Sequence, residues 1–450
     1  MKFFNLRQFN SKRLNSKRFN SKRLNVRPIG IKPIYLKKLK FFSLLIVMAA
    51  ILLYEHDNSK NTEPVSSSYE SNTEQGSLAV QNYGDSIAIS STENGTEENT
   101  INIEETRTKI SIIMVGDVLL HTKVNDSCKK NGTYNYSSIF QNVKNDIASA
   151  DIAIANQEVI LGGSELGITG YPSFNGPHEM ADSLADSGFD VICQGTNHAL
   201  DAGKKGILNC LDYWESNYPD IEVLGIHDSQ EDQNNISIYE SKGYKIALLN
   251  YTYGTNGISL PYDMPYAVDT LDETKVISDI KKAKELADFV IVFPHWGTEY
   301  NHDIDSMQEK WTQIFLDNEV DLVIGTHPHV IEPVKMLTGK NNHKMLVYYS
   351  IGNFVNWTSQ SGSGVADRML GGMAQITLTT DSNDELQIDS YGVKALISHV
   401  SSKYGKLSVY PLSDYTDSLA LENEIINQDS NFSIDYETNL CDTIWGDLWK

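Results

Sequence analysis

Five short apolar runs between residues 109 and 325 are each followed by side chains that commonly bind metal ions. The runs are KISIIMV (109–115), DIAIA (151–155), FDVICQG (189–195), FVIVF (289–293) and VDLVIG (320–325). Short apolar runs rich in β-branched residues predict buried strands. We expect further strands at 244–250 and 345–350, and helices at 178–187, 204–217, 272–288 and 306–318. Strands that alternate with helices predict an α/β fold.

The residues that follow these runs form one chemically consistent set. Because ligands of open α/β sheets lie outside the carboxyl ends of the strands, we expect five strands to bring this set to one edge. A single histidine after a strand is more often a structural hydrogen-bonding residue, so it is the recurrence that favours a metal site. Imidazole with carboxylate oxygen suits Zn, Mn or Fe rather than calcium, and eight candidates exceed the shell of one ion. The sequence therefore predicts two divalent ions among Asp117, His121, Glu158, Asn197, His198, His295, His327 and His329.

Six ordered motifs carry a resemblance to a known family. GDVLLH, ADIAIANQE, GTNHALDAG, HWGTEY, GTHPHV and YSIGNF occur in this order over about residues 110–357. This succession resembles the bacterial capsule-synthesis CapA-type family associated with poly-γ-glutamate, which is similar to calcineurin-like metallophosphoesterases. The resemblance implies an α/β fold with two packed β-sheets flanked by helices.

The resemblance also implies a role for each candidate. Asp117, His121 and His329 would hold one ion, while Asn197, His295 and His327 would hold the other. Glu158 would bridge the two ions, and His198 would be the catalytic acid that protonates the leaving group. The first motif separates Asp117 and His121 by three residues, where the phosphoesterase pattern usually has one.

Three further residues have two open interpretations each. Glu299 either orients His295 or closes an ion pair at the surface. Asn353 either contacts substrate or caps the end of a strand. Arg368 either pairs with an anionic substrate or is an ordinary surface arginine.

Residues 41–54 (FFSLLIVMAAILLY) are almost wholly apolar and follow three nearby lysines. At about 1.5 Å per residue this run is shorter than a hydrocarbon core of about 30 Å, so a cleaved signal peptide is the alternative to a membrane anchor. We favour a single-pass anchor, because the basic lead is long and no small-x-small cleavage site follows. The basic flank then stays in the cytoplasm, and the main domain lies outside the cell.

These features divide the chain into five segments. They are a basic cytoplasmic tail (1–40), the anchor (41–54), a disordered acidic linker (55–106), the CapA-type domain (107–410) and an acidic C-terminal extension (411–450). For the extension, which contains Trp445 and Trp449, packing on the domain and a free tail both remain open.

The charge of the chain and the absence of certain motifs exclude several classes of function. The first 40 residues hold 13 basic and no acidic side chains, which leaves 24 basic against 59 acidic residues in the rest. Such an acidic body excludes nucleic acid as a partner. The sequence has no P-loop, no Gly-x-Ser-x-Gly nucleophile motif and no Cys-x-x-Cys pair, so ATP-driven synthesis by this chain alone is not expected.

Three functions remain. The first is a metal-dependent hydrolase or transferase that acts on a cell-surface polymer during capsule or poly-γ-glutamate biosynthesis or export. The second is an extracellular metallophosphoesterase, and the third is a non-catalytic scaffold subunit of a polymer synthase. The expected partners are an anionic polymer such as poly-γ-glutamate, the membrane and other capsule-synthase subunits.

Overall fold

The computed structural model describes residues 107–401 and 406–450. The expectations for the basic tail, the anchor and the linker lie outside these residues. Within the described ranges, no helix combines the length and the apolar character that a membrane span requires.

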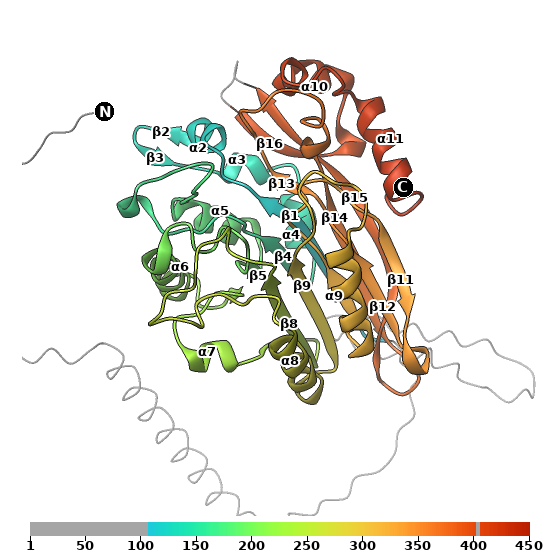
Figure 1. The fold of residues 1–450 in the computed structure, drawn as a ribbon. Coiled ribbons are helices and arrows are strands. Elements are labelled where there is room, and N and C mark those ends of the chain that lie inside the picture. The colour runs from blue at the N-terminus through green and yellow to red at the C-terminus, as the bar shows by residue number, and fades with distance from the viewer. Residues whose placement is uncertain (1–106, 402–405) are drawn as a thin grey trace, which may run out of the picture. The chain divides into compact units, whose positions relative to one another are not determined.

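An eight-stranded mixed sheet contains the first three predicted strands. Its order is β16-β15-β14-β1-β4-β5-β6, and β13 pairs with β1 beside β14 (Figure 1). The strands β1, β4, β5 and β6 run parallel, whereas β14, β15 and β16 are antiparallel. The bounds are β1 (Lys109–Val118), β4 (Ile152–Asn156), β5 (Val191–Cys193), β6 (Glu222–Leu224), β13 (Asn353–Val355), β14 (Leu370–Thr380), β15 (Leu386–Ser401) and β16 (Lys406–Pro411).

A six-stranded sheet contains the later predicted strands. Its order is β11-β12-β10-β9-β8-β7, with a parallel centre and an antiparallel strand at each edge. The bounds are β7 (Ser237–Ser241), β8 (Tyr244–Thr252), β9 (Phe289–His295), β10 (Leu322–Ile324), β11 (Val334–Thr338) and β12 (Lys344–Tyr348). A small separate hairpin joins β2 (Lys129–Lys130) to β3 (Thr133–Tyr134).

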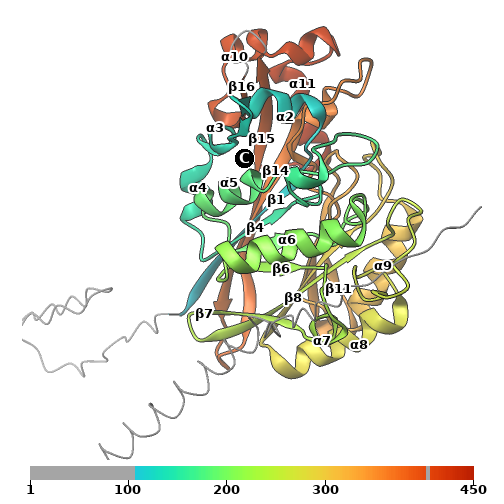
Figure 2. The same cartoon turned by 90° about the vertical axis from the view of Figure 1, so that its left-hand side faces the viewer.

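Helices lie outside the two sheets (Figures 1 and 2). The α-helices are α2 (Thr122–Cys128), α3 (Ser137–Phe140), α4 (Lys144–Ala148), α5 (Glu179–Ser187), α6 (Gly203–Asn217), α7 (Gln230–Asn234), α8 (Glu273–Leu286), α9 (Ser306–Asp317), α10 (Asp417–Glu422) and α11 (Ile434–Ile444). The short 3-10 helices are η1 (Ser164–Leu166), η2 (Lys340–Asn342), η3 (Asp367–Met369), η5 (Leu412–Asp414) and η6 (Glu424–Asn427). All four predicted helices are present, as α5, α6, α8 and α9.

Alternation along the strands explains why the sheets pack face to face. In β8, Ile246 and Leu248 belong to the core shared with the larger sheet, whereas Ala247 and Leu249 belong to the core under α8 and α9. Successive side chains of a strand point to opposite faces, so β8 must be covered on both sides. The predicted class, two packed β-sheets flanked by helices, is confirmed.

The expectation that one sheet edge carries all the ligands is wrong. Strands β1, β4 and β5 belong to the larger sheet, whereas β9 and β10 belong to the smaller one. After β6, the chain passes through α7 and the β7–β8 hairpin and so begins a second sheet. The ligand-bearing ends therefore come from two sheets that face each other.

The C-terminal extension packs on the domain. The Trp445 side chain is 3% exposed, and its Nε1 donates to the carbonyl of Glu332 at 3.1 Å. Because this contact joins residues 113 positions apart, the extension is part of the folded body. Figure 1 shows α10 and α11 beside the ends of β15 and β16.

Candidate metal centre

Glu158 lies at the centre of a histidine cluster. Its carboxylate Oε1 is 3.6 Å from His329 Nε2, 3.8 Å from His295 Nε2 and 3.9 Å from His198 Nε2. Glu158 is fully buried, and neither of its oxygens has a hydrogen-bond partner among the described residues. Burial raises the pKa of this carboxyl well above its usual range. A buried carboxylate that faces three imidazoles without hydrogen bonds has the arrangement of a ligand prepared for a cation.

The two histidines of the Thr-His-Pro-His segment complete the tightest group. Ligand atoms of Glu158, His327 and His329 all lie within 4.8 Å of one another. The backbone φ angles are +102° at His327 and +61° at His329. Positive φ at non-glycine residues is strained and is often retained at functional sites. The structure holds both imidazoles in the cluster at the expense of local backbone strain.

His329 is held by side-chain contacts with two residues of the larger sheet, Asp117 and Asn353. Asp117 lies on β1, and its Oδ2 is 3.0 Å from His329 Nδ1. Asn353 begins β13; its Oδ1 is 3.1 Å from the same nitrogen, and its Nδ2 donates to the backbone carbonyl of His329. Asn353 is therefore a residue that orients His329. The pKa of His329 is raised to about 9, because the charges of Glu158 and Asp117 outweigh the opposing effect of burial.

Asn197 and His295 meet on the other side of the cluster. Asn197 Oδ1 is 3.0 Å from His295 Nε2, while His295 Nδ1 is 2.9 Å from Thr326 Oγ1. The rings of His295 and His327 lie 4.8 Å apart. Burial lowers the pKa of both histidines well below the usual value, so both are neutral imidazoles. The neutral form is the one that binds metal ions.

His198 is oriented by an aspartate. Its Nδ1 lies 2.6 Å from Asp201 Oδ2, so Nε2 is the nitrogen that faces the cluster. Asn256 Nδ2 lies 3.3 Å from His198 Nδ1, and Asn256 Oδ1 accepts from Asn197 Nδ2 at 3.3 Å. A histidine held by a carboxylate, with its second nitrogen directed into a site, has the geometry of a proton-transfer residue.

His121 lies at the margin of the site. It precedes α2, is partly exposed, and contacts Phe174 with ring centroids 5.4 Å apart. Phe174 in turn packs edge-on against His198 at 4.7 Å. Burial, followed by the charges of His329, Arg368 and His198, lowers the pKa of His121 to about 3. His121 is therefore a neutral imidazole, and it lies close enough to the cluster for the charges there to lower its pKa.

The remaining two candidates occupy different environments. Glu299 is exposed, whereas Arg368 is 7% exposed and its guanidinium carbon lies 4.6 Å from the Tyr300 ring centroid. Arg368 is therefore a buried residue. The Tyr300 ring is 6.0 Å from the His329 ring, which places this pair beside the cluster.

Sequence reasoning assigned no role to several residues that contact the candidates. Among them are Asn156, which donates to Asp117 Oδ1 at 2.8 Å, and Asp201, Asn256 and Thr326. Asp201 had a local signal, because it follows His198 by three residues and so lies about one helical turn away. The contact of Asn256 with His198 joins residues 58 positions apart, which no local pattern reveals.

The donor set fits divalent metal ions. Imidazole nitrogens, carboxylate oxygens and one amide oxygen are ligands of Zn, Mn and Fe. Among the candidate ligands, three buried atoms have no hydrogen-bond partner within the described residues: both oxygens of Glu158, and Nδ1 of His327. Since buried polar atoms are nearly always paired, these atoms match a centre that is completed by a cation.

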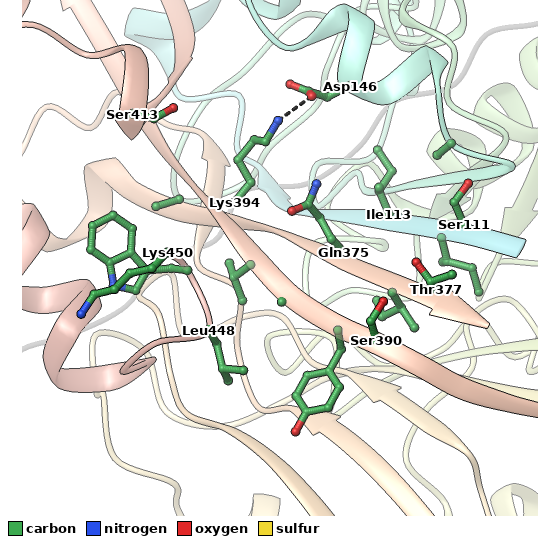
Figure 3. A pocket seen from close by; sticks show the side chains of 18 of the residues that line it. Ser111, Ile113, Asp146, Gln375, Thr377, Ser390, Lys394, Ser413, Leu448 and Lys450 are labelled. Atoms are coloured by element: carbon green, nitrogen blue, oxygen red, sulfur yellow. Dashed lines mark hydrogen bonds and ion pairs between the residues drawn. The ribbon is translucent and has the colours of Figure 1, made fainter. Parts of the chain in front are cut away.

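A separate cavity lies elsewhere on the protein. It has a volume of about 710 Å³ and lies beside β1, β14 and β15, near the C-terminus (Figure 3). Its side chains include Ser111 and Ile113 near the start of β1, and Lys394, which pairs with Asp146. The histidine cluster lies at the opposite end of β1 from this cavity.

Comparison with known proteins places the ligand-bearing region in one family. The sequence model of the family described as bacterial capsule synthesis protein PGA_cap matches residues 111–358. This range includes every candidate ligand from Asp117 to His329.

Two curated relatives align over 273 residues, or 57% of this chain. The PGA biosynthesis protein CapA of Bacillus subtilis (strain 168) is 29% identical over 66% of its own length. The capsule biosynthesis protein CapA of Bacillus anthracis is 25% identical over 63% of its length. The chain thus spans just under two thirds of each relative.

Solved structures with partial likeness include two nucleotidases. The NAD nucleotidase of Haemophilus influenzae has a TM-score of 0.44 and 14% identity, over 75% of this chain and 60% of that chain. The 5′-nucleotidase precursor of Thermus thermophilus has a TM-score of 0.41 and 13% identity, over 64% of this chain and 54% of that chain. Likeness at this level says nothing about substrate.

Proposed function

Because the chain belongs to the bacterial capsule synthesis protein family PGA_cap, we propose that it is a metal-dependent hydrolase or transferase of capsule-polymer biosynthesis or export. The observation that carries this proposal is Glu158, a buried carboxylate without hydrogen bonds that faces three imidazoles. As an ion, a carboxylate in this arrangement is unfavourable unless a cation binds, which supports a metal centre over a scaffold whose site holds no metal.

We propose that two ions bind here. Asp117, His121 and His329 would hold one, Asn197, His295 and His327 would hold the other, and Glu158 would be shared. Bound divalent ions supply Lewis-acid polarisation of the scissile bond and lower the pKa of a nucleophilic water.

His198 would act as the general acid. With Nδ1–H donating to Asp201, its Nε2 is free to carry a proton toward the leaving group. Asp201 keeps the His198 ring directed at the cluster. The contact with Phe174 limits rotation of the imidazole.

The substrate we propose is an anionic cell-surface polymer such as poly-γ-glutamate. Positive ions in the cluster would offset the strongly acidic composition of the body, which otherwise repels a polyanion. Residues 41–54 would anchor the chain in the cell membrane, with the catalytic body outside and other capsule-synthase subunits nearby.

The test combines metal analysis with two substrates. Full-length protein in detergent is reconstituted with Mn, Zn or Fe, and its metal content is measured by elemental analysis. Turnover is then assayed on poly-γ-glutamate and on a chromogenic phosphodiester. We expect close to two ions per chain and cleavage or transfer of the polymer.

Each alternative has its own outcome. Turnover of the phosphodiester alone would make the protein an extracellular phosphoesterase. A metal content near zero would contradict the metal centre and would favour the scaffold function.

A further inference from the structure

We propose that the cavity lined by Arg368 and Tyr300 binds a carboxylate group of the substrate beside the reacting bond. This inference rests on the proposed function and specifies which part of the polymer the site recognises.

Arg368 is a buried cation without a counter-charge. Its side chain forms no ion pair with any carboxylate in the described ranges, although the residue is only 7% exposed. Two neutral oxygens accept from it, Gly364 O at 3.1 Å and Gln360 Oε1 at 2.7 Å. A guanidinium remains charged at all accessible pH values, and burying a charge without an opposite one is unfavourable. A negatively charged ligand would remove this penalty.

The adjacent aspartate is engaged elsewhere. Asp367 Oδ1 accepts from the Tyr436 hydroxyl at 2.6 Å, and Asp367 Oδ2 is 3.2 Å from His302 Nε2. Tyr436 lies on α11, so the C-terminal extension holds η3, and with it Arg368, in place. The charge of Arg368 therefore stays available to a ligand.

The cavity adjoins the metal-ligand cluster. Asn353 Nδ2 donates to the backbone carbonyl of Arg368 at 2.9 Å, and Asn353 Oδ1 is 3.1 Å from His329 Nδ1. Tyr300 stacks against the guanidinium on one side, and its ring is 6.0 Å from the His329 ring. A group bound at Arg368 thus lies next to a bond held at the cluster.

The lining indicates a singly charged group. The cavity has a volume of about 480 Å³, and besides Arg368 its polar side chains, Tyr300, Gln360, Ser361 and Ser363, are uncharged. One cation surrounded by hydroxyl and amide groups balances a carboxylate, whereas a phosphate dianion would leave a charge unpaired. In a γ-linked glutamate polymer, each residue carries one free carboxylate next to its amide bond. The Arg368 cavity likewise lies next to the cluster at which the amide bond would be held.

The experiment measures binding without turnover. Full-length, metal-loaded protein carrying His198→Ala is titrated calorimetrically with a γ-linked glutamate trimer and with the same trimer amidated at its α-carboxylates. We expect Arg368→Gln to weaken binding of the free trimer by roughly 10- to 100-fold, the worth of one hydrogen-bonded charge pair, and to leave the amidated trimer unaffected.

Two further variants control for misfolding of Arg368→Gln and for the loss of one positive charge from the protein as a whole. Ser363→Glu places a carboxylate at an exposed position of the lining and should cause the same loss without touching Arg368. Lys335→Gln removes an equal charge from a cation–π pair with Tyr349 outside the cavity and should change nothing. If Arg368→Gln fails to fold, Ser363→Glu decides the question.

Several results would overturn the proposal. Equal affinity for free and amidated trimers, or no effect of Arg368→Gln and Ser363→Glu, would remove the carboxylate from the cavity. Inorganic phosphate that binds more tightly than the trimer, and only with Arg368 present, would assign the cavity to phosphate.

Failure of this inference is distinguishable from failure of the proposed function. Arg368-dependent binding with no polymer turnover by the unsubstituted protein would contradict the function alone. Turnover with a KM that Arg368→Gln leaves unchanged would contradict the carboxylate site alone.

Discussion

Burial sets the protonation of the groups around Glu158. It lowers the pKa of His295 and His327 and raises that of Glu158, because charged forms are poorly solvated in the interior. Neutral imidazoles are ready to bind a cation, whereas Glu158 needs one in order to be stable as a carboxylate. His295 and His327 are thus prepared for metal at the level of single side chains, whereas His329, whose pKa is raised to about 9, must release its proton before it can bind an ion.

Two histidine substitutions should fail in different ways. His198→Ala should retain the metal ions and lower turnover by roughly 10²- to 10⁴-fold, the usual contribution of a positioned general acid. His327→Ala should lower metal content as well as activity, because His327 belongs to the tightest ligand group. Elemental analysis and kinetics on the same preparations check both. Full metal and unimpaired polymer formation in both variants would contradict the catalytic assignment.

Glu158→Gln should separate stability from metal binding. Glutamine keeps the shape but removes a buried charge, so metal-stripped variant and metal-stripped unsubstituted protein should unfold at similar temperatures, or the variant at a higher one. Added metal should raise the Tm of the unsubstituted protein and not that of the variant. Differential scanning fluorimetry with and without EDTA measures this. An equal metal-induced rise in both would rule Glu158 out as a ligand.

At the level of secondary structure, glycine lets two neighbouring segments approach closely next to the site. A Cβ on Gly116 of β1 would lie 1.8 Å from the carbonyl oxygen of Gly352, just before β13. Asp117 N donates to that same carbonyl at 3.1 Å. The close approach places Asp117 and Asn353, which both contact His329, in register.

Gly116→Ala should therefore be strongly destabilising. The methyl group must push β1 away from Gly352, and because overpacking costs about 1–3 kcal/mol, we expect a loss near the upper end of that range. Urea denaturation gives the change in free energy of unfolding. Gly254→Ala is the matched control, since a Cβ there meets nothing within 4 Å. Equal free energies of unfolding for the two variants would show that Gly116 and Gly352 do not approach each other closely.

Outside the site, a charged histidine, His227, joins α7 to the segment that contains Asp269. His227 Nδ1 is 3.0 Å from Asp232, and His227 Nε2 is 2.9 Å from Asp269. Burial opposes the charge, but the two carboxylates outweigh it and raise the pKa of His227 to about 9. Lys275 also lies 3.4 Å from Asp269. Both ring nitrogens can donate only when the imidazole is protonated.

His227→Gln should show a pH-dependent loss of stability. Because the folded-state pKa lies above the ordinary value of 6.5, the stabilisation is complete below pH 6.5 and is lost as pH rises through about 9. We expect a loss of about 2 kcal/mol at pH 6 that disappears near pH 10. Denaturant unfolding at several pH values measures this. A loss of unfolding free energy that is the same at every pH would contradict a role for the protonated His227 imidazole.

At the scale of the whole molecule, charge is distributed unevenly along the chain. Residues 1–40 hold 13 basic and no acidic side chains, and the apolar run 41–54 separates them from the acidic remainder. A basic segment beside an apolar run is retained in the cytoplasm during insertion. This order favours a body held outside the cell, where a capsule polymer lies.

Membrane fractionation should recover the protein with residues 1–54 attached. Protease added to intact cells should remove the chain beyond residue 55 and spare the basic tail. Mass spectrometry of the protected fragment identifies it. Mature protein that begins near residue 55 in the medium would instead establish a cleaved signal peptide.

Local sequence patterns were enough to predict the elements and the residue types of the candidate site. The run at 109–115 became β1, the Thr-His-Pro-His segment followed β10, and the predicted helices all formed. These predictions succeeded because apolar periodicity and strand-end position are local properties that burial then reinforces. The family motifs added the correct pair of facing sheets.

The tertiary structure, in contrast, sets how the site is assembled. It divided the ligand-bearing strands between two sheets, and it brought His329 to Asp117 across 212 positions of sequence. It also buried Arg368 without an acidic partner among the described residues, and packed Trp445 against the carbonyl of Glu332. These contacts depend on which surfaces remain to be covered once the sheets have formed. Such long-range packing produces no periodic pattern in the sequence, so the residue types at neighbouring positions do not predict it.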